Sequence, residues 1–301
     1  GGDASFAFGH PEKEVDFSHR ATHEMTVAGK AVTAAFYGTS PNKAFFAGCS
    51  AGGRQAITEA QRYPADYDAI AAGPPAYHWG TTSVGAFWAS SAMLKTPASR
   101  LPPPALALLH KGALDQCDVL DRVTDGVIED PRSCAFDPRV LQCAVGATAG
   151  CLSSDQVAAA RAIYSGPHNS TGSVMPGLPK GSELGWNVLV QNDEPISLIT
   201  TGLKYLVFGD PNWDYRTFNW DRDVERVRTS RTRLHDAANP NIGAFVARGG
   251  KLLVYHGWTD PLIAAQNSID YVSRVGAALG AEKTRGAVRL FLAPGMNHCS
   301  G

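Results

Sequence analysis

The sequence predicts an α/β fold in which a large insertion interrupts a parallel sheet. Near the N-terminus, an apolar run, a helical pattern and a second apolar run follow one another, and the same order returns after Gly250. This alternation is typical of parallel sheets. Residues 87–239 are rich in Pro, Gly, Cys, Trp and Asp and do not continue it. We therefore expect a discontinuous core at 1–86 and 240–301, with a lid domain at 87–239.

The first elements follow from local periodicity. Glu14 to Tyr37 predicts an amphipathic helix, because apolar residues recur at steps of three and four: Phe17, Ala21, Met25, Ala28, Val32 and Ala35. The apolar run Lys43 to Gly48 predicts a buried strand. A helix is expected from about Gly52 to Arg62, before a proline, and a second strand from Asp68 to Ala72.

The later elements resemble the first ones. Lys251 to His256 and Val288 to Ala293 predict two more strands, and Leu262 to Leu279 predicts the helix between them. No internal repeat or low-complexity segment is visible. Only four core strands are predicted in all.

Composition excludes several classes of protein. The chain has 301 residues, of which 44% are hydrophobic and 18% charged, and this excludes a disordered chain. The formal charge of -1 lacks the positive excess of a nucleic-acid binder. No apolar run is long enough to span a bilayer. We expect a small-molecule substrate and neither nucleic acid nor membrane as partner; oligomeric state cannot be inferred.

Six cysteines suggest disulfides. None forms a CxxC pair, which argues against a structural zinc site, and four of them fall within a short polar region. An even number of clustered cysteines favours an oxidising compartment, so we expect a secreted or periplasmic protein, although no signal peptide is present in this sequence. Reduced cytosolic thiols are the alternative.

The segment Gly48-Cys49-Ser50-Ala51-Gly52 matches G-x-S-x-G. This motif forms a strained turn between a strand and a helix and exposes the serine oxygen. The match is weak by itself, but here an apolar strand enters it and a helix leaves it. Ser50 is therefore a candidate nucleophile, and the Ala51 N–H a candidate oxyanion donor. An ordinary helix N-cap is the alternative reading of Ser50.

A serine nucleophile needs a base and an acid to orient that base. Asp260 follows the third predicted strand and His298 follows the last, so the order is Ser, Asp, His, as in α/β-hydrolases. His256 is the rival base, although a histidine at that position is more often a packing residue. A bridge between Cys49 and Cys299 would bring Ser50 and His298 together; two unpaired thiols are the alternative.

These residues resemble the CS-D-HC arrangement of the tannase and feruloyl esterase family, which includes mono(hydroxyethyl) terephthalate hydrolases. The similarity includes three stretches: Ala4 to Glu12, Phe45 to Arg54 and Leu290 to Cys299. It implies an α/β-hydrolase core, truncated at both ends in this chain, with a large inserted lid. It also implies a secreted serine carboxylesterase that cleaves hydroxycinnamoyl, galloyl or similar aromatic esters with Ser50, His298 and Asp260.

The resemblance also assigns residues in the lid. It implies a structural calcium ion bound by the side chains of Asp118, Asp121 and Asp125 and the carbonyls of Val123 and Val127. The spacing does not fit an EF-hand, and from the residues alone a solvated acidic loop is preferred. By the same resemblance Cys117 pairs with Cys134, and Cys143 with Cys151.

Aromatic lid residues are candidates for substrate contacts, since the lid forms the acyl pocket in the family. They are Trp213, Tyr215 and Phe218, joined by Leu262 and Ile263 after the catalytic acid. A small core within the lid itself is the alternative role for the three aromatic residues.

The chain departs from the family in one respect. Strands before the first helix, which supply a second oxyanion donor in relatives, have no counterpart here, and we expect the natural enzyme to be longer and sheet surfaces to be exposed. The alternatives are a catalytically impaired, calcium-stabilised binding module or fragment of such an esterase, and a thiol-disulfide redox protein. The redox protein is disfavoured because its reactive cysteines normally form CxxC.

Overall fold

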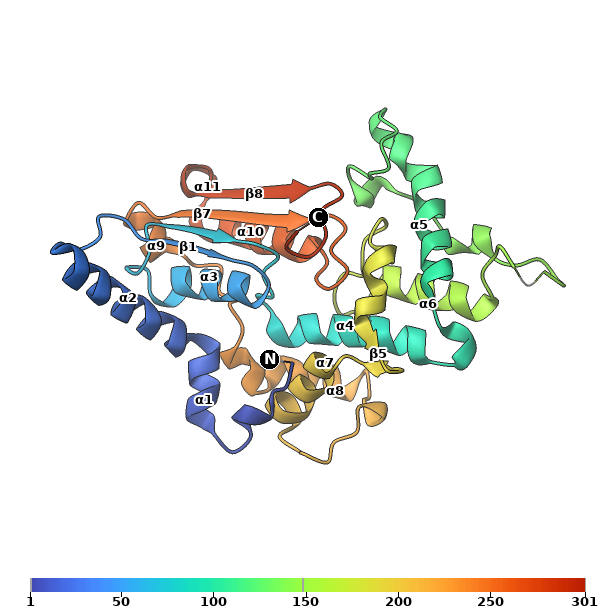
Figure 1. Ribbon diagram of the computed structural model, residues 1–301, viewed down its shortest axis with the longest axis horizontal. Helices are drawn as coiled ribbons and strands as arrows, with labels where there is room; N and C mark the ends of the chain where they lie inside the picture. Colours follow the sequence, from blue (N-terminus) through green and yellow to red (C-terminus); the bar gives the residue numbers. More distant parts are fainter. Residues whose placement is uncertain (1, 148, 301) are drawn as a thin grey trace.

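A computed structural model describes residues 2–147 and 149–300, so Gly1 and Gly301, the ends of the predicted core, lie outside it. Its main feature is a four-stranded parallel sheet of order β1-β2-β7-β8 (Figure 1). The strands are β1 (Phe45–Gly48), β2 (Ala69–Ala72), β7 (Lys251–Gly257) and β8 (Val288–Ala293). The α/β prediction is confirmed, and each predicted strand lies within two residues of the observed one.

Helices cover one face of this sheet. They are α3 (Ala51–Arg62), α9 (Gly243–Ala247) and α10 (Gln266–Leu279), and α11 (Ala281–Ala287) leads into β8. Their apolar side chains form one buried core with alternate residues of the strands, including Ile57, Ile70, Leu252, Val254 and Tyr271. The strands therefore end over a rigid layer, which positions the loops that follow them.

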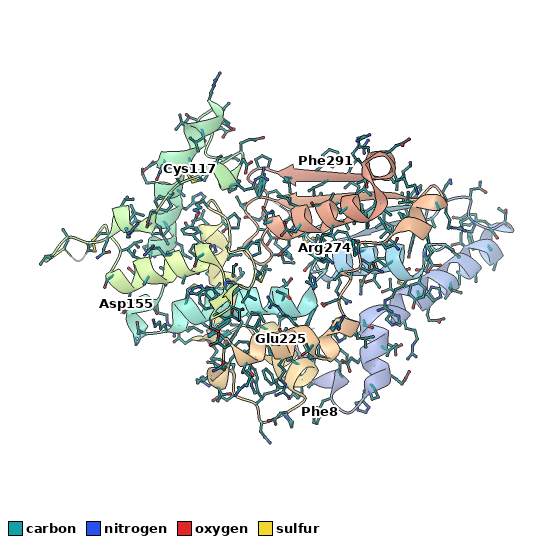
Figure 2. All side chains as sticks on the ribbon, turned by 180° about the vertical axis from the view of Figure 1, so that it is seen from behind. Phe8, Cys117, Asp155, Glu225, Arg274 and Phe291 are labelled. Atoms are coloured by element: carbon teal, nitrogen blue, oxygen red, sulfur yellow. A yellow bond between two sulfur atoms is a disulfide. The ribbon has the colours of Figure 1, made fainter. Side chains whose placement is uncertain are left out.

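The opposite face of the sheet carries exposed apolar side chains. Phe45 is 70% exposed and Phe291 is 56% exposed, although parallel sheets are normally covered on both faces. An open apolar hollow of about 530 Å³ crosses the same face at Ala47, Ala71 and Leu253. Figure 2 shows the molecule from behind, with Arg274 on α10 in front of the sheet and Phe291 on its outer strand. Exposed sheet surface was expected from the sequence.

The N-terminal helix differs from the prediction. It consists of α1 (Pro11–Val15), a π-helical turn (Asp16–Arg20) and α2 (Ala21–Tyr37), which ends at Gly38 in the left-handed conformation. Its expected apolar face is not buried, since Met25 is 60% and Val32 68% exposed. Apolar periodicity identifies such a face but does not supply a surface for it to pack against.

The inserted region is mostly helical. Its first helix, α4, begins at Trp79, earlier than the predicted boundary at residue 87. The other helices are α5 (Pro103–Cys117), α6 (Ser154–Ser165), α7 (Ser197–Gly202) and α8 (Arg222–Thr229), and two hairpins pair β3 (His168–Asn169) with β4 (Gly172–Ser173) and β5 (Val190–Gln191) with β6 (Glu194–Pro195).

Short 3₁₀ and π segments connect these elements. They are Ser5–Ala7, Pro97–Ser99, Asp118–Asp121, Pro131–Ser133, Pro138–Leu141, Glu183–Leu189, Leu203–Phe208, Tyr215–Thr217 and Arg231–Leu234. The inserted region has its own buried clusters, one around Leu109 and Trp186 and another around Phe87 and Leu203. No helix in the described residues is long and apolar enough to cross a membrane.

Candidate active site

Ser50 lies at a sharp turn between β1 and α3. Its φ of 62° and ψ of -118° are strained for a residue with a side chain. Small neighbours permit the turn, because a Cβ on Gly48 would lie 2.6 Å from the Gly52 carbonyl oxygen, and one on Gly53 would lie 2.0 Å from that of Gly73. The predicted strand–turn–helix geometry is therefore present, and Gly53 is a constraint that the five-residue motif does not include.

Ala51 is the first residue of α3 and is exposed. Backbone N–H groups in the first turn of a helix have no partner within the helix and carry partial positive charge. Its N–H lies at the N-terminus of α3, next to Ser50, and the oxyanion role stays a prediction.

The loops after β7 and β8 lie side by side. The N–H groups of Trp258 and Thr259 donate to the carbonyl oxygens of Ala293 and Met296, at 2.9 and 3.0 Å. A Cβ on Gly257 would lie 2.0 Å from the Met296 oxygen, so only glycine permits this approach. The two loops carry Asp260 and His298.

Asp260 and His298 form a hydrogen bond of 2.7 Å between Oδ2 and Nδ1. Asp260 is completely buried, and its Oδ1 accepts hydrogen bonds from the N–H groups of Leu262 and Ile263. Burial raises the pKa of this carboxyl, but hydrogen bonds from His256 and His298 outweigh burial and lower it to about 2. Asp260 is thus ionised at neutral pH, so Nδ1 of His298 carries a proton and Nε2 is left to accept one.

His256, the rival base, is buried and fully hydrogen-bonded. Nε2 lies 2.8 Å from the Ile263 carbonyl oxygen and 3.2 Å from Oδ2 of Asp260, while Nδ1 lies 2.7 Å from the Ser268 hydroxyl. A carbonyl oxygen only accepts, so Nε2 is the protonated nitrogen. His256 therefore supports the Asp260 loop and has no nitrogen left for a substrate.

A disulfide connects the serine turn with the histidine loop. Cys49 and Cys299 are bonded, with Cα atoms 5.9 Å apart, across a sequence separation of 250. This pairing was predicted and is confirmed. It places Ser50 and His298, the adjacent residues, at the same end of the sheet.

Ser50 and His298 line one pocket of about 90 Å³. Most of its walls are apolar, and they include Leu262 and Ile263, which were predicted to contact substrate. The other wall residues are Ala76, four residues of α4 (Trp79, Thr82, Ser83 and Ala86), Ile196, and Leu198 and Ile199 of α7. The sequence analysis missed these residues; the only signal was that α4 directly follows the second strand.

Trp213, Tyr215 and Phe218 are absent from the described walls of the Ser50 pocket. They pack instead against the cluster around Phe87: the rings of Phe87 and Phe218 are 5.2 Å apart, and Trp213 stacks on Phe208 at 4.4 Å. These residues therefore lie in a core of the inserted region, which is the alternative role that the sequence left open for them.

The predicted calcium loop is folded by its own aspartates. Both carboxylate oxygens of buried Asp118 accept backbone hydrogen bonds, from Asp125 and Gly126, and Asp121 and Asp125 accept those of Val123 and Val127.

The atoms of this loop that were predicted to bind calcium are all oxygens, which are the ligands that calcium prefers. In the described residues, one group of His, Cys, Asp or Glu side chains has three possible ligand atoms within 4.8 Å of one another. That group does not include the aspartates of this loop. The carboxylates of Asp118, Asp121 and Asp125 therefore do not all lie within 4.8 Å of one another. The predicted disulfides Cys117–Cys134 and Cys143–Cys151 are both present.

The whole chain, including the strained serine, the buried Asp–His pair and the disulfide beside them, is similar to proteins of one known family. The family described as tannase and feruloyl esterase matches residues 1–301. The chain belongs to the tannase and feruloyl esterase family. Among its relatives, mono(2-hydroxyethyl) terephthalate hydrolase of Piscinibacter sakaiensis is 32% identical over 353 residues, which include 98% of this chain and 58% of that protein.

Solved structures of family members are also similar. A crystal structure of an esterase from Aspergillus oryzae has a TM-score of 0.93 and 32% identity, covering all of this chain and 60% of that one. Feruloyl esterase B from the same organism has a TM-score of 0.90 and 30% identity, covering 99% and 61%. The chain therefore spans little more than half the length of the family members that it matches.

Proposed function

We propose that this chain is the catalytic part of a serine carboxylic ester hydrolase that acts on aromatic esters of the hydroxycinnamoyl or galloyl type. The observation that carries the proposal is that Ser50 and His298 line one pocket, with His298 hydrogen-bonded to an ionised, buried Asp260. Membership of a family whose members include esterases supports the same reaction.

In the proposed mechanism, Ser50 Oγ attacks the ester carbonyl while its proton passes to Nε2 of His298. Asp260 stabilises the imidazolium and holds the ring, and the Ala51 N–H donates to the oxyanion. His298 then returns the proton to the departing alcohol, which leaves an acyl group on Ser50. A water molecule gives a proton to His298 and attacks this acyl group, and Ser50 recovers its proton as the acid leaves.

The pocket walls support an aromatic acyl group. Trp79, Leu262 and Ile263 offer apolar surface beside the nucleophile, whereas few polar groups are present to solvate an aliphatic polar acid. We propose residues 87–239 as the lid domain that closes this pocket over the core at 1–86 and 240–301.

We also propose a structural calcium ion in the loop of Asp118, Asp121 and Asp125, with the carbonyls of Val123 and Val127 as further ligands. Calcium would supply positive charge that draws the three carboxylates together, neutralises them and cross-links the loop. The three disulfides support a secreted or periplasmic location, because such bonds persist in oxidising compartments.

The test combines covalent labelling with a substrate panel. A fluorophosphonate should modify one residue, Ser50, and Ser50→Ala should abolish labelling, whereas Ser83→Ala, which removes another hydroxyl of the same pocket, should remain labelled. Methyl ferulate, methyl gallate and mono(hydroxyethyl) terephthalate should be hydrolysed in preference to methyl acetate. Absence of both labelling and hydrolysis would favour a binding module that has lost activity.

A further inference from the structure

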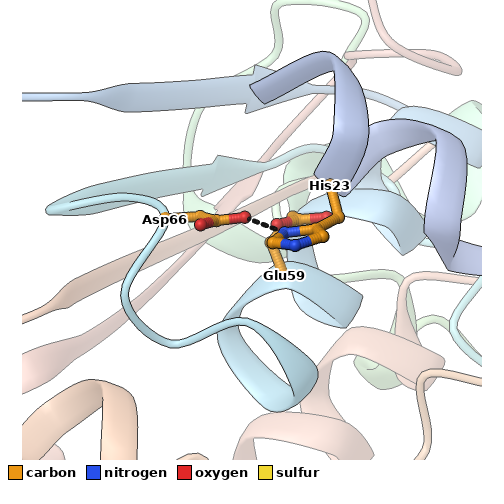
Figure 3. Close-up of side chains that lie close together, drawn as sticks. All are labelled: His23, Glu59 and Asp66. Atoms are coloured by element: carbon orange, nitrogen blue, oxygen red, sulfur yellow. Dashed lines mark hydrogen bonds and ion pairs between the residues drawn. The ribbon is translucent and has the colours of Figure 1, made fainter. Parts of the chain in front are cut away.

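Three titratable side chains meet away from the Ser50 pocket (Figure 3). His23 comes from α2, Glu59 from α3, and Asp66 from the loop between α3 and β2. Nδ1 of His23 lies 2.6 Å from Oδ2 of Asp66, and one ligand atom from each residue lies within 4.8 Å of the other two. Two ligands of one zinc ion lie at most about 4.4 Å apart, so a small movement of these side chains would let one ion contact all three atoms.

Glu59 is the informative member of this cluster. It is completely buried, and neither carboxylate oxygen accepts a hydrogen bond from an N–H or hydroxyl group of the described residues. A buried carboxylate without a partner is strongly destabilising, and buried charges are normally paired or bound to metals.

The neighbouring groups leave the cluster available for a cation. The amino group of Lys30 donates to the backbone oxygen of Asp66, not to its carboxylate. Tyr63 stacks on the His23 ring with centroids 4.0 Å apart, and its hydroxyl is hydrogen-bonded to His19, so the imidazole is held in place. The His23 side chain is 28% exposed, which gives an ion a path from solvent.

We propose that His23, Glu59 and Asp66 form a binding site for one divalent transition-metal ion of the zinc type. An imidazole nitrogen with two carboxylates suits zinc, whereas calcium prefers oxygen ligands alone. The two carboxylates balance the charge of the ion, and a fourth position would be open to water.

The site would fasten α2 to the core. The apolar side chains of α2 are largely exposed, so polar contacts hold this helix: Thr26 with the Tyr67 hydroxyl, Lys30 with Asp66, and His23 with Asp66. A metal ion shared by His23, Glu59 and Asp66 would join α2, α3 and the loop before β2 at one point. Its role is structural, because the cluster is separate from the Ser50 pocket.

The test uses tag-free protein, stripped with a chelator and titrated with Zn²⁺ by calorimetry, with bound zinc counted by elemental analysis. The wild type should bind one equivalent, and its Tm should rise. His23→Gln and Glu59→Gln should each weaken binding more than 100-fold. His78→Gln is the matched control, since His78 faces a single carboxylate, Asp236, at 3.3 Å, and should bind zinc as the wild type does.

Two further measurements separate this site from other effects. Asp125→Ala should retain zinc, because it alters only the loop proposed for calcium. Circular dichroism should show that Glu59→Gln is folded; if it is not, His23→Gln decides, since this side chain is partly exposed. Wild-type protein without bound zinc, or zinc retained by both His23→Gln and Glu59→Gln, would overturn the proposal.

Discussion

Cys49 and Cys299 are joined by a disulfide with a Cα separation of 5.9 Å, although 250 positions separate them in sequence. Each precedes or follows a residue of the Ser50 pocket directly: Cys49 precedes Ser50, and Cys299 follows His298. Both Ser50 and Cys299 have positive φ, at 62° and 70°. The bridge therefore connects two turns that each contain a non-glycine residue with positive φ.

Removing this bridge should affect stability and turnover together. The Cys49→Ala, Cys299→Ala double variant should lose up to about 5 kcal/mol of unfolding free energy, because the closed loop is very long. Its kcat on an aryl ester should also fall, since His298 loses its anchor. The Cys143→Ala, Cys151→Ala double variant removes a bridge with a sequence separation of only 8. It should lose about 2.5 kcal/mol of unfolding free energy, without a comparable fall in kcat. Equal kcat in both double variants would contradict this role.

Substitution of the two histidines around Asp260 should have unequal effects. His298→Ala should lower kcat by about 10⁴-fold or more, and Asp260→Asn by about 10⁴-fold, because the tautomer of His298 is no longer fixed. His256→Gln removes a buried hydrogen-bonding side chain, so it should lower Tm and reduce kcat much less. Thermal unfolding and kcat measured on the same three variants provide the check. A loss for His256→Gln as large as that for His298→Ala would identify His256 as the base.

Asp260 should make the fold sensitive to acid. Its pKa is about 2 in the folded protein, against about 3.9 for an unfolded chain. A depressed pKa gives stability that is present above pH 4 and lost as the pH falls towards 2, by about 2 kcal/mol. Urea unfolding at pH 6 and pH 2 should therefore show the advantage of wild type over Asp260→Asn shrinking by this amount. An advantage independent of pH would show that the carboxylate is not stabilised by its partners.

Substitutions of pocket residues and of residues in the core of the inserted region should affect different quantities, KM and Tm. Leu262→Ala should raise KM for methyl ferulate by about 10-fold, because it removes apolar surface beside Ser50. Trp213→Ala should lower Tm and leave KM unchanged, since Trp213 stacks on Phe208 in the inserted region. Steady-state kinetics and thermal unfolding distinguish the two. A KM that responds to Trp213→Ala would return this residue to the substrate site.

Calcium removal should destabilise the inserted region selectively. Dialysis against EGTA should lower Tm by several degrees, and Asp125→Ala should lower it as much and abolish the response to EGTA. Asp130→Ala is the control, because Asp130 is nearby in the chain but pairs with Arg132. An Asp125→Ala protein that still responds to EGTA would place the ion elsewhere.

The sequence was sufficient to predict the core for a clear physical reason. Each of the four strands is a short apolar run between turn residues, and their order follows from the alternation of strands and helices. The Ser50 turn and the Asp260 loop were predictable because both follow such strands. The packing of α2 was not, since exposed Val32 has the same periodicity as a buried residue.

Contacts between side chains from elements distant in sequence could not be predicted. Trp79 and Leu198 reach the Ser50 pocket from elements with no catalytic motif, and their approach depends on the path of the whole insertion. His23, Glu59 and Asp66 likewise come from different elements and follow no metal-binding spacing. Only tertiary packing brings these groups together.

The placement of the insertion between neighbouring strands sets the order in which the protein can assemble. Ala69 of β2 pairs with Lys251 of β7, yet everything in between is synthesised before Lys251 emerges from the ribosome. Cys117–Cys134 and Cys143–Cys151 can therefore oxidise early, while Cys49 waits until almost the entire polypeptide is available. Once the two local bridges have closed, the four cysteines that they contain are no longer available to pair with Cys49.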